Sequence, residues 1–174
     1  FPNQLLNFFC QKSHKIGANV HENIDEIIYP ILTKYGEIKL CVGSRVLLMR
    51  ATTFHTKEPE TLAWIDSFDD GDVFYDIGAN IGIYSLYAAN KGHQVLAFEP
   101  ESLNYAEINK NIHLNALSEK IKCYNIGLNN ETKFDQLNLS CFKKGWAMHT
   151  ATSAKDFEGK DFMPEYRQGL FLSS

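Results

Sequence analysis

The sequence predicts an α/β protein built on a Rossmann-like, doubly wound parallel sheet, and two stretches indicate this fold. Residues 73–85, VFYDIGANIGIYS, combine a short apolar strand with a glycine-bearing turn and the start of a helix. Residues 94–100, QVLAFEP, form a second apolar strand that ends in an acid and a proline. Because such sheets bind ligands at the carboxyl ends of their strands, we expect a nucleotide-binding edge after both strands.

The composition is that of an ordinary globular domain with its own core: 174 residues, 44% hydrophobic and 22% charged. The net charge of −4 leaves no basic excess for a phosphate backbone, so we expect no nucleic-acid partner. No apolar run is long enough for a membrane span and no signal peptide is recognisable, which favours a cytoplasmic protein. The four cysteines and six histidines show no ligand spacing, so we expect no metal site.

The N-terminal part is predicted to combine a helical cap with a β-hairpin. Apolar residues recur at three- and four-residue spacing over 24–32, the pattern of an amphipathic helix, which Pro30 would kink. We therefore expect a helical cap over residues 1–35, with a lid or partner-facing helix as the alternative. The period then changes to strand-like alternation, which predicts a β-hairpin over residues 37–54 with its second strand at 46–49.

A helix is predicted over residues 58–68, EPETLAWIDSF. Pro59 suits the first helical turn, and the two glutamates there complement the helix dipole. Its buried stripe would comprise Leu62, Ile65 and Phe68. Residues 1–57 would thus precede a nucleotide-binding domain over residues 58–174.

The turn after the first parallel strand carries the main binding signal. At such a turn the backbone approaches the ligand, and a side chain on Gly78 or Gly82 would block that approach. Ala79 and Asn80 lie between the glycines and are expected to contact the same ligand. The helix that follows, over about residues 82–90, points free N–H groups and the positive end of its dipole at the site.

Two residues in the first turn of that helix are further candidates. Ser85 is placed to touch a carboxylate of the ligand. Tyr84 is expected either to form a wall of the site or to pack in the core.

The pattern around the glycines narrows the class of ligand that the turn can bind. It departs from the dinucleotide fingerprint G-x-G-x-x-G, because Asn80 stands at the second glycine and Ile83 at the third. Asp76 places a carboxylate at the end of the strand, before the first glycine. A negative charge there is a poor neighbour for a pyrophosphate and a good one for a cationic group. S-adenosylmethionine, with its amino group and sulfonium, fits better than a nicotinamide dinucleotide.

The second strand ends in Glu99 and Pro100. Glu99 lies 23 residues after Asp76. An acid at this place accepts hydrogen bonds from both ribose hydroxyls. Each such bond to an ionised acceptor contributes roughly 1.5–3 kcal/mol. The alternative is a solvated loop charge.

The elements beyond this strand become progressively less distinct. A helix is predicted over 102–115, followed by a third parallel strand over 121–126. Asn125 lies at the carboxyl end of that strand, where this fold commonly contacts the adenine edge. Further strands are expected over 132–139 and 162–172.

An exposed loop is predicted between them, over residues 141–161. His149 in this loop is of the type used as a general base, and Trp146 is of the type that stacks on sugars. The favoured interpretation is nevertheless an irregular surface segment with one buried aromatic residue.

The motifs DIGANIGIYS, LAFEPESLNYAEINKNIHLN and KEPETLAWIDSF together resemble the FkbM-type methyltransferase family. The resemblance covers about residues 38–172. It implies a class I S-adenosylmethionine-dependent enzyme that methylates hydroxyl groups of sugars, polysaccharides or related small molecules. It also implies that the helix over 58–68 lies near the methionine end of the cofactor, so that Glu58 and Thr61 line the site. The alternative for these two residues is a capping acid and a solvated threonine.

The family pattern normally continues with a further strand and an acidic Asp-x-Asp/Glu-Gly motif, which this sequence lacks. We therefore expect the C-terminal part of the sheet to be missing, either because the chain is part of a longer protein or because it is a reduced domain. The expected function is S-adenosylmethionine-dependent O-methylation of a small-molecule or glycan acceptor, with no catalytic base assigned. The alternatives are a non-catalytic cofactor-binding or scaffold domain and, less favoured, an NAD-dependent oxidoreductase.

Overall fold

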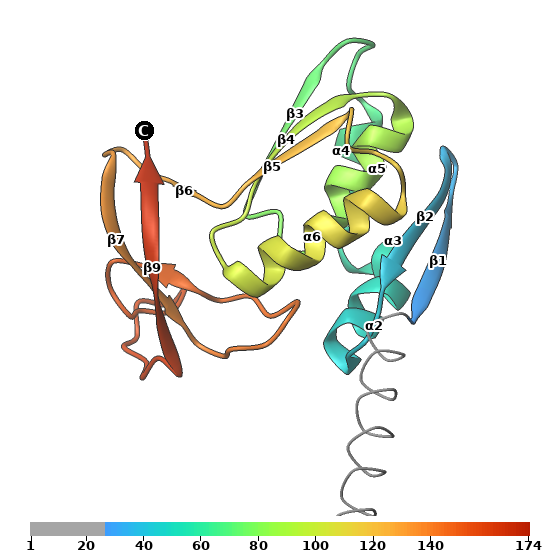
Figure 1. Ribbon diagram of the computed structural model, residues 1–174. Coiled ribbons are helices and arrows are strands. Elements are labelled where there is room, and N and C mark those ends of the chain that lie inside the picture. The colour runs from blue at the N-terminus through green and yellow to red at the C-terminus, as the bar shows by residue number, and fades with distance from the viewer. Residues whose placement is uncertain (1–26) are drawn as a thin grey trace, which may run out of the picture.

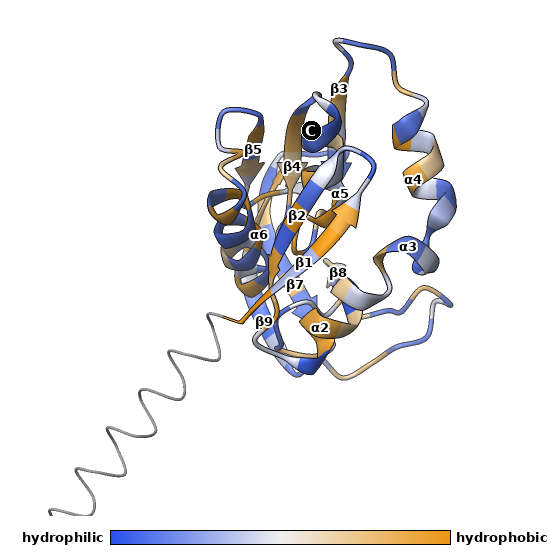
Figure 2. Ribbon diagram, turned by 90° about the vertical axis from the view of Figure 1, so that its right-hand side faces the viewer, coloured by the Kyte–Doolittle hydropathy of each residue, from blue (hydrophilic) through white to orange (hydrophobic). Residues whose placement is uncertain are grey.

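The computed structural model describes residues 27–174, and its centre is the predicted parallel sheet (Figure 1). Strands β3 (Val73–Ile77), β4 (Gln94–Phe98) and β5 (Ile121–Tyr124) lie in the order β3-β4-β5, with both neighbouring pairs parallel. Ile77 pairs with Phe98, which brings the carboxyl ends of β3 and β4 to the same edge. This α/β arrangement is the one that the sequence predicts, and Figure 2 shows hydrophobic residues concentrated on these strands.

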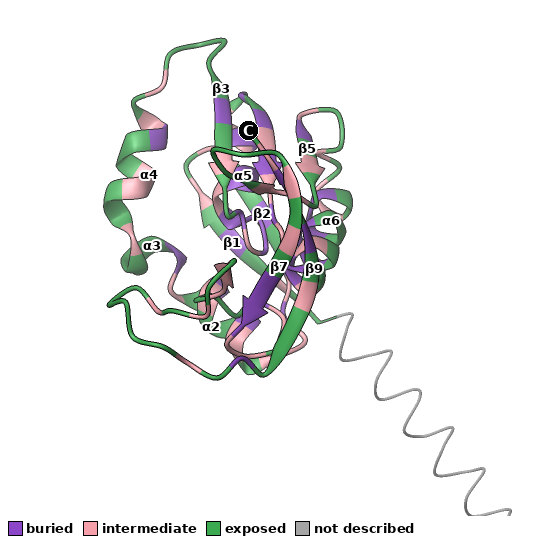
Figure 3. Cartoon of the chain, turned by 90° about the vertical axis from the view of Figure 1, so that its left-hand side faces the viewer, coloured by how far each residue is buried: buried purple, intermediate pink, exposed green. Residues whose placement is uncertain are grey.

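Helices α5 (Ile83–Lys91) and α6 (Ser102–Leu114) connect the three strands in the predicted order. Both pack between the parallel sheet and an N-terminal hairpin, as Figure 1 shows. Helix α5 is buried over most of its length, whereas the outer side of α4 (Pro59–Asp66) is exposed (Figure 3). The shared core includes Ile38, Leu40, Leu47, Ile65, Leu86, Val95, Ala97 and Ile108.

The helix predicted up to residue 35 is wrong where the structure describes it, because β1 (Ile28–Thr33) is a strand. It forms an antiparallel hairpin with β2 (Gly36–Cys41), in which Ile31 pairs with Ile38. The helical spacing of the apolar residues does not mark a buried stripe, since Leu32 is 74% exposed. Pairing with β2 therefore outweighs the local pattern. The rest of the predicted helical cap lies outside the described residues.

The second strand of the predicted hairpin is also wrong, because α2 (Arg45–Thr52) is a helix. Ser44 caps this helix: its Oγ accepts a hydrogen bond from the Leu47 N–H at 3.2 Å. Leu47 and Ala51, four residues apart, are its buried positions. A short helix, α3 (Phe54–Lys57), connects α2 to α4. The predicted helix over 58–68 is confirmed as α4.

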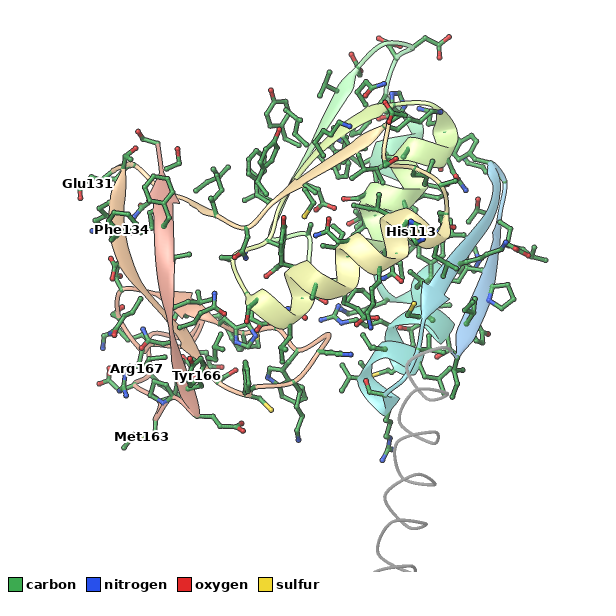
Figure 4. The ribbon with its side chains drawn as sticks, in the orientation of Figure 1. His113, Glu131, Phe134, Met163, Tyr166 and Arg167 are labelled. Atoms are coloured by element: carbon green, nitrogen blue, oxygen red, sulfur yellow. The ribbon has the colours of Figure 1, made fainter. Side chains whose placement is uncertain are left out.

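A second sheet, of four strands, follows the parallel one. Its strands are β6 (Gly127–Leu128), β7 (Lys133–Leu139), β8 (Thr150–Ala151) and β9 (Tyr166–Ser173), in the order β6-β9-β7-β8. The predicted strands over 132–139 and 162–172 thus exist, but they pair with each other and not with the parallel sheet. Figure 4 labels Phe134 and Arg167 on the side of this sheet away from the helices. Four leucines form its own small core: Leu137, Leu139, Leu170 and Leu172.

One face of the parallel sheet is uncovered within residues 27–174. Tyr75, Phe98 and Tyr124 stack across the three strands there, with ring centroids 6.4 and 5.7 Å apart. Tyr75 is 57% exposed and Ile77 66% exposed. The outer edge of β3 likewise has no strand beside it among these residues.

The predicted boundary at residue 57 stays a prediction. Residues on both sides of it contribute to one hydrophobic cluster, since Ile38 and Leu47 pack in the same core as Leu86. None of the helices in residues 27–174 has the length and apolar character needed to cross a bilayer.

Candidate functional site

The candidate site lies where the carboxyl ends of β3 and β4 meet. The N–H groups of Gly78 and Ala79 both donate to the Phe98 carbonyl, at 2.9 and 3.1 Å, which ties the glycine turn to the end of β4. Gly78 has φ +80°, and a Cβ added there would meet no atom within 4 Å. The space above Gly78 is therefore open, as a close approach of the backbone to a ligand requires.

Glu99 connects this turn to the loop after β4. Its Oε2 accepts from the Asn80 N–H at 2.6 Å and its Oε1 from the Glu101 N–H at 2.8 Å. A carboxylate oxygen can accept more than one hydrogen bond, so capacity for a ligand hydroxyl remains. Burial raises the pKa of Glu99 to about 7, the nearby Glu101 and Asp76 charges add to the rise, and the two backbone donors oppose it.

Asp76 lies on the neighbouring strand end. Ser85 Oγ donates to its Oδ2 at 2.5 Å, and burial raises the pKa of the Asp76 carboxyl against the effect of that hydrogen bond. Ser85 itself is fully buried. Its hydroxyl thus already has a protein partner and holds Asp76 in place, while its predicted contact with a ligand carboxylate stays a prediction.

The two glycines of the turn have different roles. A Cβ on Gly82 would lie 2.4 Å from Cγ1 of Ile108, a fully buried side chain of α6. Gly82 therefore leaves room for the packing of α5 against α6, and its predicted contact with the ligand stays a prediction. The Ala79 side chain is likewise buried in the core, so only its backbone belongs to the surface of the turn.

The loop after β7 that contains Gly145 and Trp146 closes one side of the site, although the sequence pattern did not place it there. Gly145 donates its N–H to Asn104 Oδ1 at 2.7 Å. The Trp146 carbonyl accepts from Asn80 Nδ2 at 2.8 Å and from Asn104 Nδ2 at 3.0 Å. The loop is thus fastened to the glycine turn and to the first turn of α6.

Between this loop and the strand ends lies a cavity of about 180 Å³. Four of the predicted site residues line it: Gly78, Asn80, Glu99 and Pro100. The lining residues that sequence reasoning did not assign to the site are Glu101, Asn104, Leu137, Trp146, Ala147, Met148 and His149. Asn104 carried no sequence signal, because one asparagine among several on a helix looks like a solvated residue.

On the other side of the turn, Glu58 and Tyr84 line a small cavity of about 30 Å³. Arg50, which sequence reasoning missed because it lies just after a predicted strand, lines it as well. Arg50 Nε donates to the Gly145 carbonyl at 2.6 Å, and burial lowers the pKa of its guanidinium, with Glu58 opposing that effect. Burial and a hydrogen bond to Glu58 raise the pKa of Tyr84. Thr61 lines neither cavity.

Asn125 lies at the end of β5 but turns towards the β4 loop. Its Nδ2 donates to the carbonyls of Glu99 and Pro100 at 2.8 and 3.1 Å. It does not line the 180 Å³ cavity, and its predicted contact with adenine stays a prediction. Within residues 27–174 no group of three or more His, Cys, Asp or Glu side chains is arranged to hold a metal ion.

Comparison with known proteins gives partial likenesses. A 61-residue stretch, 35% of this chain, is 33% identical to a tRNA (guanine(37)-N(1))-methyltransferase of Anopheles darlingi and spans only 12% of that protein. No protein-family model matches the chain, so the resemblance to the FkbM family depends on its motif residues alone.

Two solved structures overlap with about half of the chain. One is TYW2 of P. horikoshii in complex with MeSAdo, with 21% identity, 57% of this chain and 36% of that chain covered, and a TM-score of 0.41. The other is a SAM-dependent methyltransferase of Agrobacterium tumefaciens, with 15% identity, 56% and 32% coverage, and a TM-score of 0.43.

The different roles of the two glycines are testable. Gly78 and Gly82 share φ +80°, so alanine at either position carries the same backbone strain, but only Gly82→Ala inserts a methyl group against Ile108. We expect Gly82→Ala to lower the free energy of unfolding by about 1–3 kcal/mol more than Gly78→Ala, the usual cost of overpacking a core. Urea denaturation without ligand measures both. Equal losses would contradict the packing role.

Proposed function

We propose that the chain forms the cofactor-binding part of an S-adenosylmethionine-dependent methyltransferase. The observation that carries this proposal is Glu99, held at the end of β4 beside the open turn at Gly78, with Asp76 on the adjacent strand end. Ionised Glu99 would accept the ribose hydroxyls. Asp76 supplies negative charge where a cationic amino group or sulfonium is stabilised and a pyrophosphate is not.

Different residues of the site suit different parts of this cofactor. The 180 Å³ cavity is smaller than the roughly 300–1,000 Å³ of pockets that enclose a whole small molecule. It therefore suits one part of the molecule, and the remainder would extend over Gly78, where the space is open. Arg50 and Glu58, on the far side of the turn, offer opposite charges to the amino-acid end.

The chemistry then depends mainly on alignment. Bound S-adenosylmethionine supplies an already activated methyl group to a nucleophile on the acceptor. The chain's contribution is to hold that group in line, since well-oriented reactants reach effective molarities of roughly 10⁵–10⁸ M. The glycine turn, fixed to β4 through the Phe98 carbonyl, provides a rigid support for this alignment.

For the acceptor we propose a hydroxyl group of a sugar, polysaccharide or related small molecule, as the FkbM-type motifs suggest. RNA is the second candidate, because the Anopheles darlingi relative is named as a tRNA methyltransferase. The net charge of −4 speaks against a large phosphate-binding surface on this chain. A cytoplasmic location belongs to the same proposal. A non-catalytic cofactor-binding domain would share the site but transfer no methyl group.

Titration calorimetry tests the cofactor class. We expect the folded chain to bind S-adenosylhomocysteine with micromolar affinity and NAD not at all, because Asp76 disfavours a pyrophosphate. NAD binding without S-adenosylhomocysteine binding would indicate an oxidoreductase. No binding of either by a folded chain would contradict the proposal.

Methyl transfer from labelled S-adenosylmethionine tests the acceptor. We expect label in a hydroxyl-rich polysaccharide fraction and none in RNA, because the chain lacks a basic excess. Label in RNA would replace the first candidate by the second. Binding without transfer to either would favour the non-catalytic alternative.

The raised pKa of Glu99 predicts a pH-dependent affinity. With a pKa of about 7, the Glu99 carboxyl stays largely protonated below pH 7. It accepts both ribose hydroxyls fully only when it is ionised. Affinity for S-adenosylhomocysteine should therefore rise about tenfold between pH 6 and pH 8. Glu99→Gln should bind more weakly and lose this dependence, whereas Glu119→Gln, at an exposed acid, should keep it. A flat profile in the unchanged chain would remove Glu99 from the ribose contact.

A further inference from the structure

The loop over the cavity carries an imidazole with no partner. Both ring nitrogens of His149 are buried, and neither finds a hydrogen-bond partner among residues 27–174. Buried polar atoms are almost always paired, so such a group facing a cavity indicates an occupant that supplies the partner. Burial also lowers the pKa of His149, against the opposing charge of Glu101, so the ring is neutral and offers one donor and one acceptor.

The walls around His149 are largely apolar. Trp146 and Met148 of the same loop line the cavity with Leu137 of β7 and Pro100. Glu99 is the acid at its inner end, next to the glycine turn. Asn80, Asn104 and Glu101 also line the cavity, but their side chains are hydrogen-bonded within the protein. His149 is the lining residue whose two buried nitrogens have no partner among residues 27–174.

The loop is held in position before any ligand binds. Asn80 and Asn104 both donate to the Trp146 carbonyl, and Asn104 also accepts from Gly145. Trp146 Nε1 donates to Ser140 Oγ at 3.2 Å within the loop. These bonds come from the same elements that form the strand-end site, so the position of His149 is fixed relative to Glu99.

The three parts of an adenosyl cofactor differ in what they need. The amino-acid end is zwitterionic and suits Arg50 and Glu58 on the other side of the turn. The ribose needs an ionised acceptor, which is Glu99. The base is flat and uncharged, with neutral donors and acceptors at its edge, and the cavity below the loop offers matching groups.

We propose that His149 hydrogen-bonds the heterocyclic base of the bound nucleoside, with Trp146 and Met148 packing against that base. This inference rests on the proposed function and adds a specificity-determining residue to it. The loop after β7 then forms the wall that distinguishes an adenosyl ligand from its base-free counterpart.

Two ligands that differ only in the base test the inference. S-adenosylhomocysteine and S-ribosylhomocysteine are titrated into the unchanged chain, His149→Ala, and the control His113→Ala, whose exposed imidazole lies towards the other end of α6 (Figure 4). We expect His149→Ala to weaken S-adenosylhomocysteine binding about tenfold, as for a lost buried hydrogen bond, and to leave S-ribosylhomocysteine binding unchanged. His113→Ala should alter neither.

The outcomes separate this inference from the proposed function. Equal weakening of both ligands, or no weakening of either, in a His149→Ala chain with an unchanged unfolding temperature would overturn the contact with the base. The proposed function fails instead if the unchanged chain binds neither ligand. Nitrogen chemical shifts of His149 give a second readout: they should move on addition of S-adenosylhomocysteine and not of S-ribosylhomocysteine, and no movement with either would also overturn the contact.

Discussion

The site depends on the two hydrogen bonds that Glu99 accepts from the Asn80 and Glu101 backbones. One carboxylate thereby joins the turn after β3 to the loop after β4, two segments that the parallel sheet brings to the same edge but does not itself bond together. Glu101 in turn caps α6 by accepting from the Leu103 and Asn104 N–H groups. The position of Asn104, and through it the loop at Trp146, follows from this chain of contacts. A side chain expected to serve a ligand is thus also part of the frame that shapes the binding surface.

The central β-α-β-α-β run was predictable because its signals are local and agree with one another. Short apolar strands, the glycine-bearing turn at Gly78 and helices of the right length all indicate one arrangement. The first strand of the N-terminal hairpin was not predictable, because the spacing of Ile28, Ile31 and Leu32 by itself fits a helix. Only the pairing with β2 makes this segment a strand. Local signals describe what a segment prefers, and the pairing partner decides what it adopts.

The same distinction applies to the site. Asp76, Gly78 and Glu99 could be assigned to the candidate site because each lies at a strand end that the sequence itself marks. Arg50, Asn104 and His149 were not assigned, since they reach the site from α2, α6 and the loop after β7 through contacts between residues far apart in the chain. Gly82 shows that a motif position can also serve packing: a side chain there would meet Ile108 of α6.

The stacked aromatic rings on the open face of the sheet have a consequence for work with the protein. Tyr75 and Tyr124 expose apolar surface there, and β3 beside them presents backbone groups that no strand among residues 27–174 pairs. An unpaired strand edge next to an apolar face favours association of one molecule with another. Protein concentration and salt will therefore influence the extent to which this chain associates with itself. A measurement of its molecular mass under the conditions of a binding experiment shows which species binds.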